Sequence, residues 1–188
     1  MITPEDFVSP ANAGKIRKKI QAVIEAEAPV SEGLLTRKVV QSFGITRSGS
    51  RIQNYITSLY LSMKLKSTIQ NADRFFWKPE QEEKSYAGLR VNGEGDNKRD
   101  VRDIPMQEAA NAVCLVLYDQ ISMSHGDLVK EAAKMMGYTR SGNNVTSVFE
   151  AAIQYADTAG WLMLDSNGNC KPSEGGMDWA LRVASSGE

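Results

Sequence analysis

The sequence predicts a mainly helical protein with small β-hairpins, because one helical module occurs twice along the chain of 188 residues. The nine residues at 44–52, Gly-Ile-Thr-Arg-Ser-Gly-Ser-Arg-Ile, return 93 positions later at 137–145 as Gly-Tyr-Thr-Arg-Ser-Gly-Asn-Asn-Val. Leu35 and Leu128 have the same offset, as do the Lys-Pro pairs at 78–79 and 171–172. We therefore interpret the chain as a tandem repeat.

The first module begins with an amphipathic helix that ends at Pro29. Its apolar residues recur at the helical spacing i, i+4, i+7, i+8: Ile16, Ile20, Val23 and Ile24. A short extended segment at 29–31 follows, in which Ser31 is the expected N-cap of a second helix. That helix turns Leu35, Val39 and Phe43 inward and ends at Gly44.

A third helix is expected to start near Arg47 and Ser48. Its buried row is Ile52, Ile56, Leu59, Tyr60 and Met63. Two short strands at 67–70 and 74–77, joined by turn-forming residues at 71–73, form a hairpin, here called the wing. The order helix, short strand, helix, helix, hairpin predicts a winged helix-turn-helix.

The second module predicts the same order. Asp103 is the expected cap of its first helix, with Pro105 in the first turn. Ile121 to Met123 form the short strand, and Ser124 begins the second helix. The three helices bury one row each: Met106, Ala110, Val113 and Leu117; Leu128, Ala132 and Met136; Val145, Phe149, Ala152, Ile153 and Ala156. A hairpin starting at Trp161 completes the module.

The fold class expected is thus two tandem winged helix-turn-helix domains. The predicted boundaries are 1–79 for the first domain, 80–102 for a polar linker or extended surface connection, 103–172 for the second domain and 173–188 for a tail. The tail carries enough apolar residues for one docking turn of helix.

Composition limits the class of protein. No apolar run reaches the ~20 residues that cross a bilayer, and the N-terminus lacks signal-peptide features. Cys114 and Cys170 stand at non-equivalent places in the repeats and are expected to be free thiols in a cytoplasmic protein. Residues 1–80 carry 12 Lys and Arg against 7 Asp and Glu, whereas residues 81–188 carry 10 against 16. The first module is basic and the second acidic, which concerns partners more than fold.

The chain resembles an uncharacterised domain at the C-terminal end of large bacterial superfamily 1 helicase-like proteins, over roughly residues 15–172. The resemblance rests on an acidic-Pro-apolar element and a Phe/Leu-Gly-x-x-Arg-x-Gly element that recurs. They stand here as Glu27-Ala-Pro-Val30, Leu35, Phe43-Gly-Ile-Thr-Arg-Ser-Gly49, Arg102-Asp-Ile-Pro105 and Met136-Gly-Tyr-Thr-Arg-Ser-Gly142. This chain lacks the GxxxxGK[ST] loop of a helicase motor. The resemblance implies a nucleic-acid-processing context, often defence-related, and transfers no catalytic residue.

The repeated Thr-Arg-Ser-Gly at 46–49 and 139–142 has two interpretations. In the functional one, free N–H groups at the start of the third helix bind phosphate, with Arg47 or Arg140 forking onto it. In the structural one, the motif makes a tight turn, with Ser or Thr as the cap and Arg tied to a carboxylate. Retention in the acidic module favours the structural interpretation.

The outward face of the third helix separates the two modules. In the first module it carries Ser50, Asn54, Thr57 and Leu61, flanked by Arg47, Arg51 and Gln53. Small polar residues beside arginines suit a recognition helix. In the second module it carries Asn143, Ser147, Glu150 and Gln154, and Asn144 replaces Arg51. If either module binds DNA, we expect it to be the first.

Further cations surround this face, and three aromatic residues stand in the wing. Lys15, Arg17, Lys18 and Lys19 begin the first helix, and Lys64, Lys66, Arg74 and Lys78 bracket the wing. A solvated surface is the alternative interpretation of these cations. Phe75, Phe76 and Trp77 suggest base stacking, but the alternation of a strand places at least one side of this trio in the core.

The sequence offers no enzyme signature. The only histidine, His125, has no cysteine or acidic neighbour at metal-ligand spacing, so we expect no catalytic residue, metal or cofactor. The leading hypothesis is a non-catalytic module that binds nucleic acid. We expect the nucleic acid to be duplex DNA and the binding repeat to be the first. The alternatives are a protein-interaction module that docks a helicase-like or nuclease partner through the acidic repeat and Leu61, or a homodimer formed through the wings.

In the leading hypothesis Arg47 and Arg51 contact phosphate, Ser50 and Asn54 approach base edges, and the wing cations support them. The candidate nucleic-acid-binding residues are Arg47, Ser48, Gly49, Ser50, Arg51, Asn54, Lys64, Lys66 and Arg74.

Overall fold

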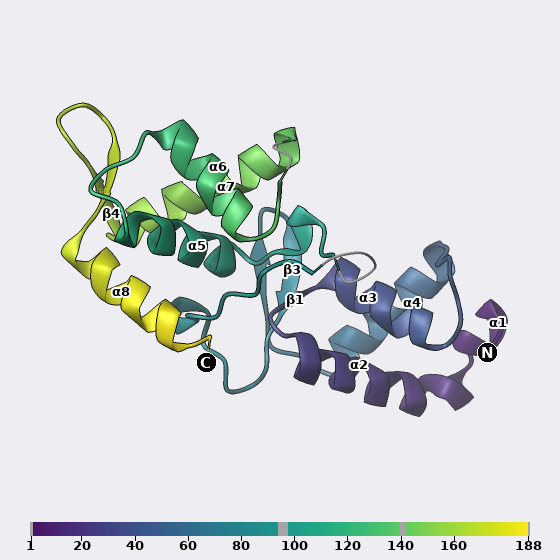
Figure 1. The fold of residues 1–188 in the computed structure, drawn as a ribbon. Helices are drawn as coiled ribbons and strands as arrows, with labels where there is room; N and C mark the ends of the chain where they lie inside the picture. The colour runs from purple at the N-terminus through teal and green to yellow at the C-terminus, as the bar shows by residue number, and fades with distance from the viewer. Residues whose placement is uncertain (1, 94–97, 140–141, 188) are drawn as a thin grey trace. The chain divides into compact units, whose positions relative to one another are not determined.

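The computed structural model describes residues 2–93, 98–139 and 142–187 (Figure 1). Two units make it up: unit 1, Met1–Gln81, and unit 2, Glu82–Glu188. Both are mainly helical and carry small antiparallel strands, as the sequence predicts. None of the helices in the described ranges is long and apolar enough to cross a membrane.

Unit 1 contains a short N-terminal helix, three longer helices and a three-stranded sheet. Its elements are α1 (Pro4–Phe7), the 3-10 turn η1 (Pro10–Asn12), α2 (Ala13–Glu27), β1 (Val30–Ser31), α3 (Glu32–Ser42), α4 (Ser50–Ser62), β2 (Ser67–Gln70) and β3 (Asp73–Phe76). The antiparallel sheet has the order β1-β3-β2, with Phe76 opposite Val30 on one side and Ser67 on the other.

The core of unit 1 follows the predicted helical rows. All four apolar residues of the predicted row in α2 are buried, and Ser31 caps α3 by accepting a hydrogen bond from Leu34 N at 3.0 Å. One core residue was not predicted: Phe7 of α1 is fully buried and meets the Phe43 ring edge-on, with the centroids 5.4 Å apart. The segment before Lys15 has no helical periodicity long enough to predict α1.

The wing turns through Asn71 and Ala72, which both have positive φ, at 48° and 70°. This is the backbone that a two-residue hairpin with right-handed strand twist requires. Phe75, Phe76 and Trp77 are each only 2 % exposed, and Trp77 Nε1 donates to Thr68 Oγ1 at 2.9 Å. The suggestion that these rings stack on bases is therefore wrong for this structure, because all three are buried.

The described residues of unit 2 form four α-helices and a two-stranded hairpin. Its elements are η2 (Glu83–Ser85), η4 (Val101–Asp103), α5 (Met106–Tyr118), α6 (His125–Met135), α7 (Asn143–Thr158), β4 (Leu162–Leu164), β5 (Cys170–Pro172) and α8 (Glu174–Ser185). Met123 forms an isolated antiparallel bridge with Cys170. The predicted strand at 121–123 is thus reduced to a single bridge.

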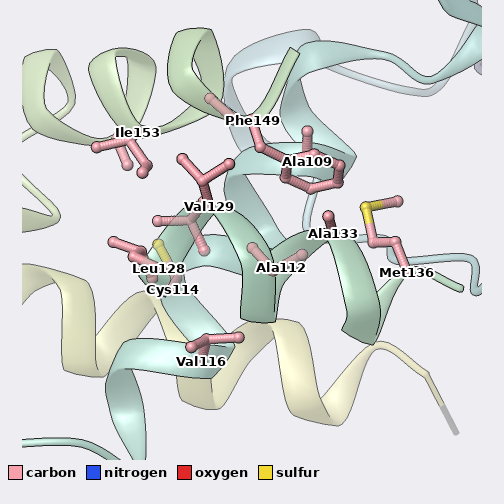
Figure 2. Packing of buried hydrophobic residues seen from close by; sticks show 14 of the residues in the cluster. Ala109, Ala112, Cys114, Val116, Leu128, Val129, Ala133, Met136, Phe149 and Ile153 are labelled. Atoms are coloured by element: carbon pink, nitrogen blue, oxygen red, sulfur yellow. The ribbon is translucent and has the colours of Figure 1, made fainter. Parts of the chain in front are cut away.

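Helix α5 is the centre of unit 2 and packs against α6, α7 and α8. Ala109 and Ala112 are fully buried, and such small side chains let neighbouring helices approach closely. Leu128 and Val129 of α6 and Phe149 of α7 fill the space around them (Figure 2). The predicted buried rows of these three helices are confirmed, except that Met106 and Val145 are only partly buried.

The start of α5 differs from the prediction. Asp103 was expected to cap the helix, but it ends the 3-10 turn η4, and the helix begins at Met106 with Pro105 as its N-cap. Ile104 has an extended backbone, with φ −92° and ψ 122°. The residue before a proline rarely adopts helical backbone angles. Ile104, which precedes Pro105, is therefore extended and separates Asp103 from the helix.

The segment predicted as a linker, 80–102, belongs to unit 2 from Glu82, and residues on both sides of 94–97 contact α5. The Asn111 side-chain amide of α5 donates to the carbonyls of Tyr86 and Gly88, at 3.1 and 2.9 Å. Its Oδ1 accepts from Trp179 Nε1 of α8 at 2.8 Å. Because Asn111 is fully buried, these contacts satisfy its polar atoms inside the unit.

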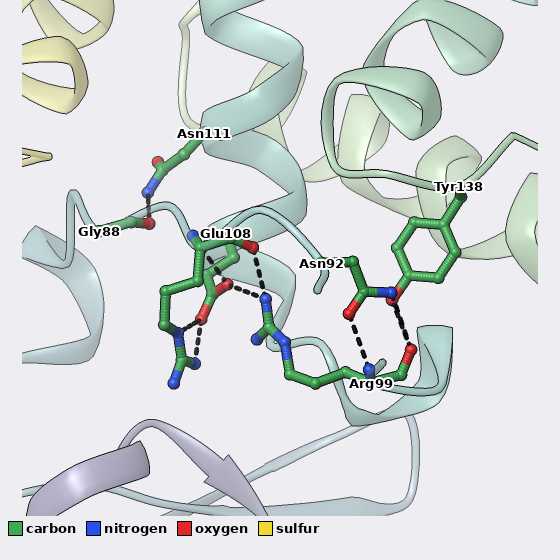
Figure 3. A network of polar contacts seen from close by, with 7 residues as sticks. Gly88, Asn92, Arg99, Glu108, Asn111 and Tyr138 are labelled. Atoms are coloured by element: carbon green, nitrogen blue, oxygen red, sulfur yellow. Dashed lines mark hydrogen bonds and ion pairs between the residues drawn. The ribbon is translucent and has the colours of Figure 1, made fainter. Parts of the chain in front are cut away.

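A buried carboxylate completes this attachment (Figure 3). Glu108 of α5 is fully buried, and it accepts from Arg90 Nε at 2.8 Å and from Arg99 Nη2 at 2.9 Å. Asn92 bonds to the backbone N–H and C=O of Arg99, at 2.7 and 3.0 Å, and the Tyr138 hydroxyl donates to the same carbonyl at 3.0 Å. Two arginines thus neutralise one buried acid.

The tail forms a full helix instead of the single turn expected from the sequence. Helix α8 begins after Ser173, whose hydroxyl accepts from Gly176 N at 2.9 Å. Trp179 of α8 stacks on Trp161, with ring centroids 4.5 Å apart. The backbone of Gly176 lies so close to that of Trp161 that a Cβ at position 176 would be 1.7 Å from the Trp161 carbonyl oxygen.

Replacement of Gly176 by alanine is expected to destabilise unit 2 by about 3 kcal/mol, because α8 must move away from the Trp161 carbonyl. Gly175→Ala is the matched control. A Cβ there meets nothing closer than 3.7 Å, and alanine improves helix propensity by up to about 1 kcal/mol. Urea unfolding followed by circular dichroism measures both variants. Equal stability of the two would contradict the close packing of α8.

Glu108→Gln is expected to destabilise unit 2 by about 3 kcal/mol, because it leaves two arginines beside a neutral buried amide. Asp100→Asn is the control, since it removes a carboxylate from the exposed Asp100–Arg102 pair, where a loss below about 1 kcal/mol is expected. Urea unfolding compares the two. Similar losses would show that burial of the Glu108 charge is unimportant.

Both thiols of the chain are expected to be protected in the folded protein. Cys114 and Cys170 are buried in unit 2, and burial raises the pKa of both, that of Cys114 to about 12. Cys114 then forms little reactive thiolate below pH 9. Labelling with a thiol reagent should be slower than in urea by at least about 1,000-fold, the factor that corresponds to roughly 4 kcal/mol of opening free energy. Fast labelling at pH 8 would contradict the burial.

Candidate nucleic-acid interface

The repeated motif of unit 1 forms the loop between α3 and α4. Gly44 has φ 82°, a conformation that favours glycine, and its N–H donates to Gln41 O at 2.9 Å. Ile45 is buried and anchors the loop to the core. Residues 46–49 then lead to α4, which begins at Ser50 and not near Arg47 as predicted. The motif therefore precedes the helix.

The contacts of this loop bear on the two interpretations of the motif. Gly49 is the N-cap of α4, and no side chain caps the helix. Arg47 is exposed and forms neither an ion pair nor a hydrogen bond with the part of the chain that the structure describes. The tight turn at Gly44 is present, but the capping hydroxyl and the tied arginine are not seen in unit 1. In unit 2, Arg140 and Ser141 lie outside the described residues.

Helix α4 presents an exposed polar face. Ser50, Arg51 and Asn54 are exposed, whereas Ile52 and Ile56 on the opposite side are buried. The helix contains no aspartate or glutamate. The first two N–H groups of α4 have no partner within the helix, and Arg47 and Arg51 lie beside them in the sequence. This face combines hydrogen-bonding groups with positive charge.

The structure separates the nine candidate residues into two groups. Six are exposed, and Ser48 is half-buried. The exposed ones are Arg47, Gly49, Ser50, Arg51, Asn54 and Lys64. Lys66 and Arg74 are engaged within unit 1: Lys66 Nζ donates to the carbonyls of Gln81 and Pro79 at 2.6 and 3.3 Å. These contacts could not be read from the sequence, since they depend on the path of the chain after the wing.

Arg74 meets a residue that sequence reasoning missed. Its Nε lies 3.3 Å from Glu32 Oε2, and its Nη1 donates to Ser67 Oγ at 3.2 Å. Glu32 also accepts a hydrogen bond from Thr57 Oγ1 at 3.1 Å. Thr57 belongs to the predicted outward row of α4 but is half-buried as a result. The only sequence signal for Glu32 is its position directly after the cap Ser31.

A groove of about 400 Å³ runs between α3 and α4. Its lining includes Glu32, Thr36, Arg37, Gln41, Gln53 and Thr57. Thr36, which lines this groove, has its hydroxyl 2.9 Å from the Tyr60 hydroxyl, and burial raises the pKa of Tyr60 above its usual range. The lining of the groove is thus part polar and part apolar, with Val40 and Ile45 among its residues, and the groove adjoins the exposed face of α4.

One cation of α2, Arg17, lies at the other end of α4. Arg17 Nη2 donates to Ser62 Oγ, in the last turn of α4, at 3.3 Å. A cation at a helix C-terminus interacts favourably with the helix dipole. Lys78 pairs with Glu25 at 3.0 Å. Arg17 and Lys78 therefore have structural partners, which supports the solvated-surface interpretation for these two.

The corresponding face of unit 2 is exposed, and its described residues carry no positive charge. Asn143, Asn144, Ser147, Glu150 and Gln154 of α7 are all exposed, as predicted. Glu150 would repel a phosphate. In the described ranges no three His, Cys, Asp or Glu residues are placed to hold a metal ion. The two units thus present different third helices.

Comparison with known proteins gives one match. Residues 5–54 are similar to the family described as "Protein of unknown function (DUF3320)". The matched span covers α2 and α3, the repeated motif and the first turn of α4. No curated protein and no solved structure matches the chain. The similarity is to an uncharacterised domain, and it includes six of the nine candidate residues: Arg47, Ser48, Gly49, Ser50, Arg51 and Asn54.

Proposed function

We propose that the protein binds duplex DNA through α4 of unit 1 and catalyses no reaction. In this proposal each unit is a winged helix-turn-helix, with α4 and α7 as the third helices. Unit 2 keeps the same order of helices and hairpin, with the Met123 bridge at the place of β1. The resemblance to a C-terminal domain of helicase-like proteins suggests a helicase- or nuclease-related context.

The observation that carries the proposal is the exposed face of α4. Arg47 and Arg51 have no partner among the described residues, so neither must break a contact to reach a phosphate. Ser50 and Asn54 lie on the same face, and an asparagine amide can form two hydrogen bonds with adenine in the major groove. The absence of acidic residues from α4 removes the charge repulsion that Glu150 would exert in unit 2.

A second candidate function is docking of a protein partner. Leu61 at the end of α4 is 65 % exposed, and in unit 2 Ile121 and Leu164 are 93 % and 63 % exposed. Exposed apolar side chains mark a protein-contact site when they form a continuous patch. The acidic charge of unit 2 would then select a basic partner. Homodimerisation through the wings stays a weaker alternative.

The test is salt-titrated binding to a random duplex, measured by fluorescence anisotropy. We expect the affinity of the wild type to fall steeply with salt. Replacement of both Arg47 and Arg51 by glutamate should abolish binding, because the phosphates then face two negative charges. Thermal unfolding checks that the variant remains folded.

The matched control is the double replacement Lys130→Glu and Lys134→Glu. It makes the same change of net charge on the exposed surface of α6 in unit 2 and should leave DNA affinity nearly unchanged. Equal loss in both variants would show that only net charge matters. If the wild type does not bind at low salt, the DNA proposal fails and docking becomes the better explanation.

A further inference from the structure

Glu32 lies where three elements of unit 1 meet. It is the first residue of α3, and its carboxylate receives a hydrogen bond from Thr57 of α4 and an ion pair from Arg74 of β3. The groove between α3 and α4 is on one side of it, and a smaller hollow of about 100 Å³ beside Arg74 and Ser67 is on the other. Its side chain is 30 % exposed, so solvent and ligands can reach it.

This carboxylate brings negative charge to the candidate interface. Helix α4 has no acidic residue of its own, and Thr57 lies on the same helical face as Asn54, three residues earlier. A phosphate that approaches this face is attracted by Arg47 and Arg51 but repelled by Glu32. The charge of Glu32 is also the reason why Arg74, a cation of the wing, points to a protein group.

We propose that Glu32 limits the affinity of the nucleic-acid site by holding Arg74 away from the phosphate backbone. This inference rests on the proposed function of unit 1. Glu32 keeps its ion pair with Arg74 in the complex, so the wing adds no phosphate contact through that arginine. Loss of the Glu32 charge releases Arg74 to the DNA and removes the repulsion.

A purely structural role for Glu32 predicts a different outcome. A carboxylate in the first turn of a helix interacts favourably with the helix dipole, and in that role its loss affects stability but not DNA binding. Glu32→Gln separates the two roles, because glutamine keeps the shape and the oxygen that accepts from Thr57 but has no charge. Glu32→Ala is a second charge-free variant in case the first does not fold.

The experiment compares these variants of the full chain on a random duplex over a series of salt concentrations. We expect Glu32→Gln to lower Kd about threefold to tenfold, the range that one released surface ion pair and one removed repulsion produce. The plot of log affinity against log salt should steepen by about 0.9, because one more cation contacts a phosphate. Adding Arg74→Gln to Glu32→Gln should restore the wild-type slope.

Glu27→Gln is the matched control. Glu27 is also 30 % exposed in unit 1, but it pairs with Lys38, so its replacement removes the same charge without releasing Arg74. It should change neither the slope nor, beyond twofold, the Kd.

Four results would overturn the inference. Binding by Glu32→Gln that equals the wild type overturns it alone, and the proposed function then stands. Tighter binding by Glu32→Gln with an unchanged salt slope would show that Glu32 only repels the phosphates. A steeper slope that Arg74→Gln does not reverse would show the same. Either result overturns the inference that Glu32 holds Arg74 away from the DNA. Absence of binding by the wild type and all variants at low salt overturns the proposed function and this inference together.

Discussion

The Glu108 carboxylate lies inside unit 2 with no exposure to solvent, and a charge in that place must be paired. Its partners, Arg90 and Arg99, precede it in the chain, and both must fold back onto α5 to reach it. Residues 82–93 and 98–103 therefore pack along α5 and do not form a free connection. The same segment also satisfies Asn111, which in turn holds Trp179 of α8. One buried acid and one buried amide thus attach both ends of unit 2 to its central helix.

Unit 1 has no comparable buried charge in its described residues, and the side chains of its ion pairs are all partly exposed. Ser31 and Glu32 are adjacent: Ser31 caps α3, and Glu32 joins α3 to α4 and the wing. This arrangement leaves Arg47 of the loop before α4 and Arg51 of its first turn without a partner among the described residues, while the wing arginine, Arg74, is engaged. Both units contain three longer helices followed by a hairpin, but they use their polar residues differently. In unit 2 these residues determine the fold, and in unit 1 several are available for a ligand.

Local patterns in the sequence predicted most of the helices well. Ile52, Ile56 and Leu59 are buried at the spacing that predicted α4. Leu128 and Ala132 are likewise buried at the spacing that predicted α6. Helical periodicity depends on residues within one or two turns, so it can be read from a short window. The exposed side of α4 follows from the same periodicity, which is why Ser50, Arg51 and Asn54 were found before the structure was known. Phe7 gave no such signal, because α1 is only four residues long and too short to show a helical period.

The sequence by itself determined the repeat, the helical rows, the turn at Gly44 and the contrast between a basic and an acidic half, because each depends on neighbours in the chain or on counting charges. Only the tertiary structure decided which charges are paired. Arg74 meets Glu32, Lys66 meets the carbonyls of Pro79 and Gln81, and Arg99 meets Glu108. Pairing depends on distances between segments that are remote in the sequence, and the cost of burying an unpaired charge then selects among the possible partners.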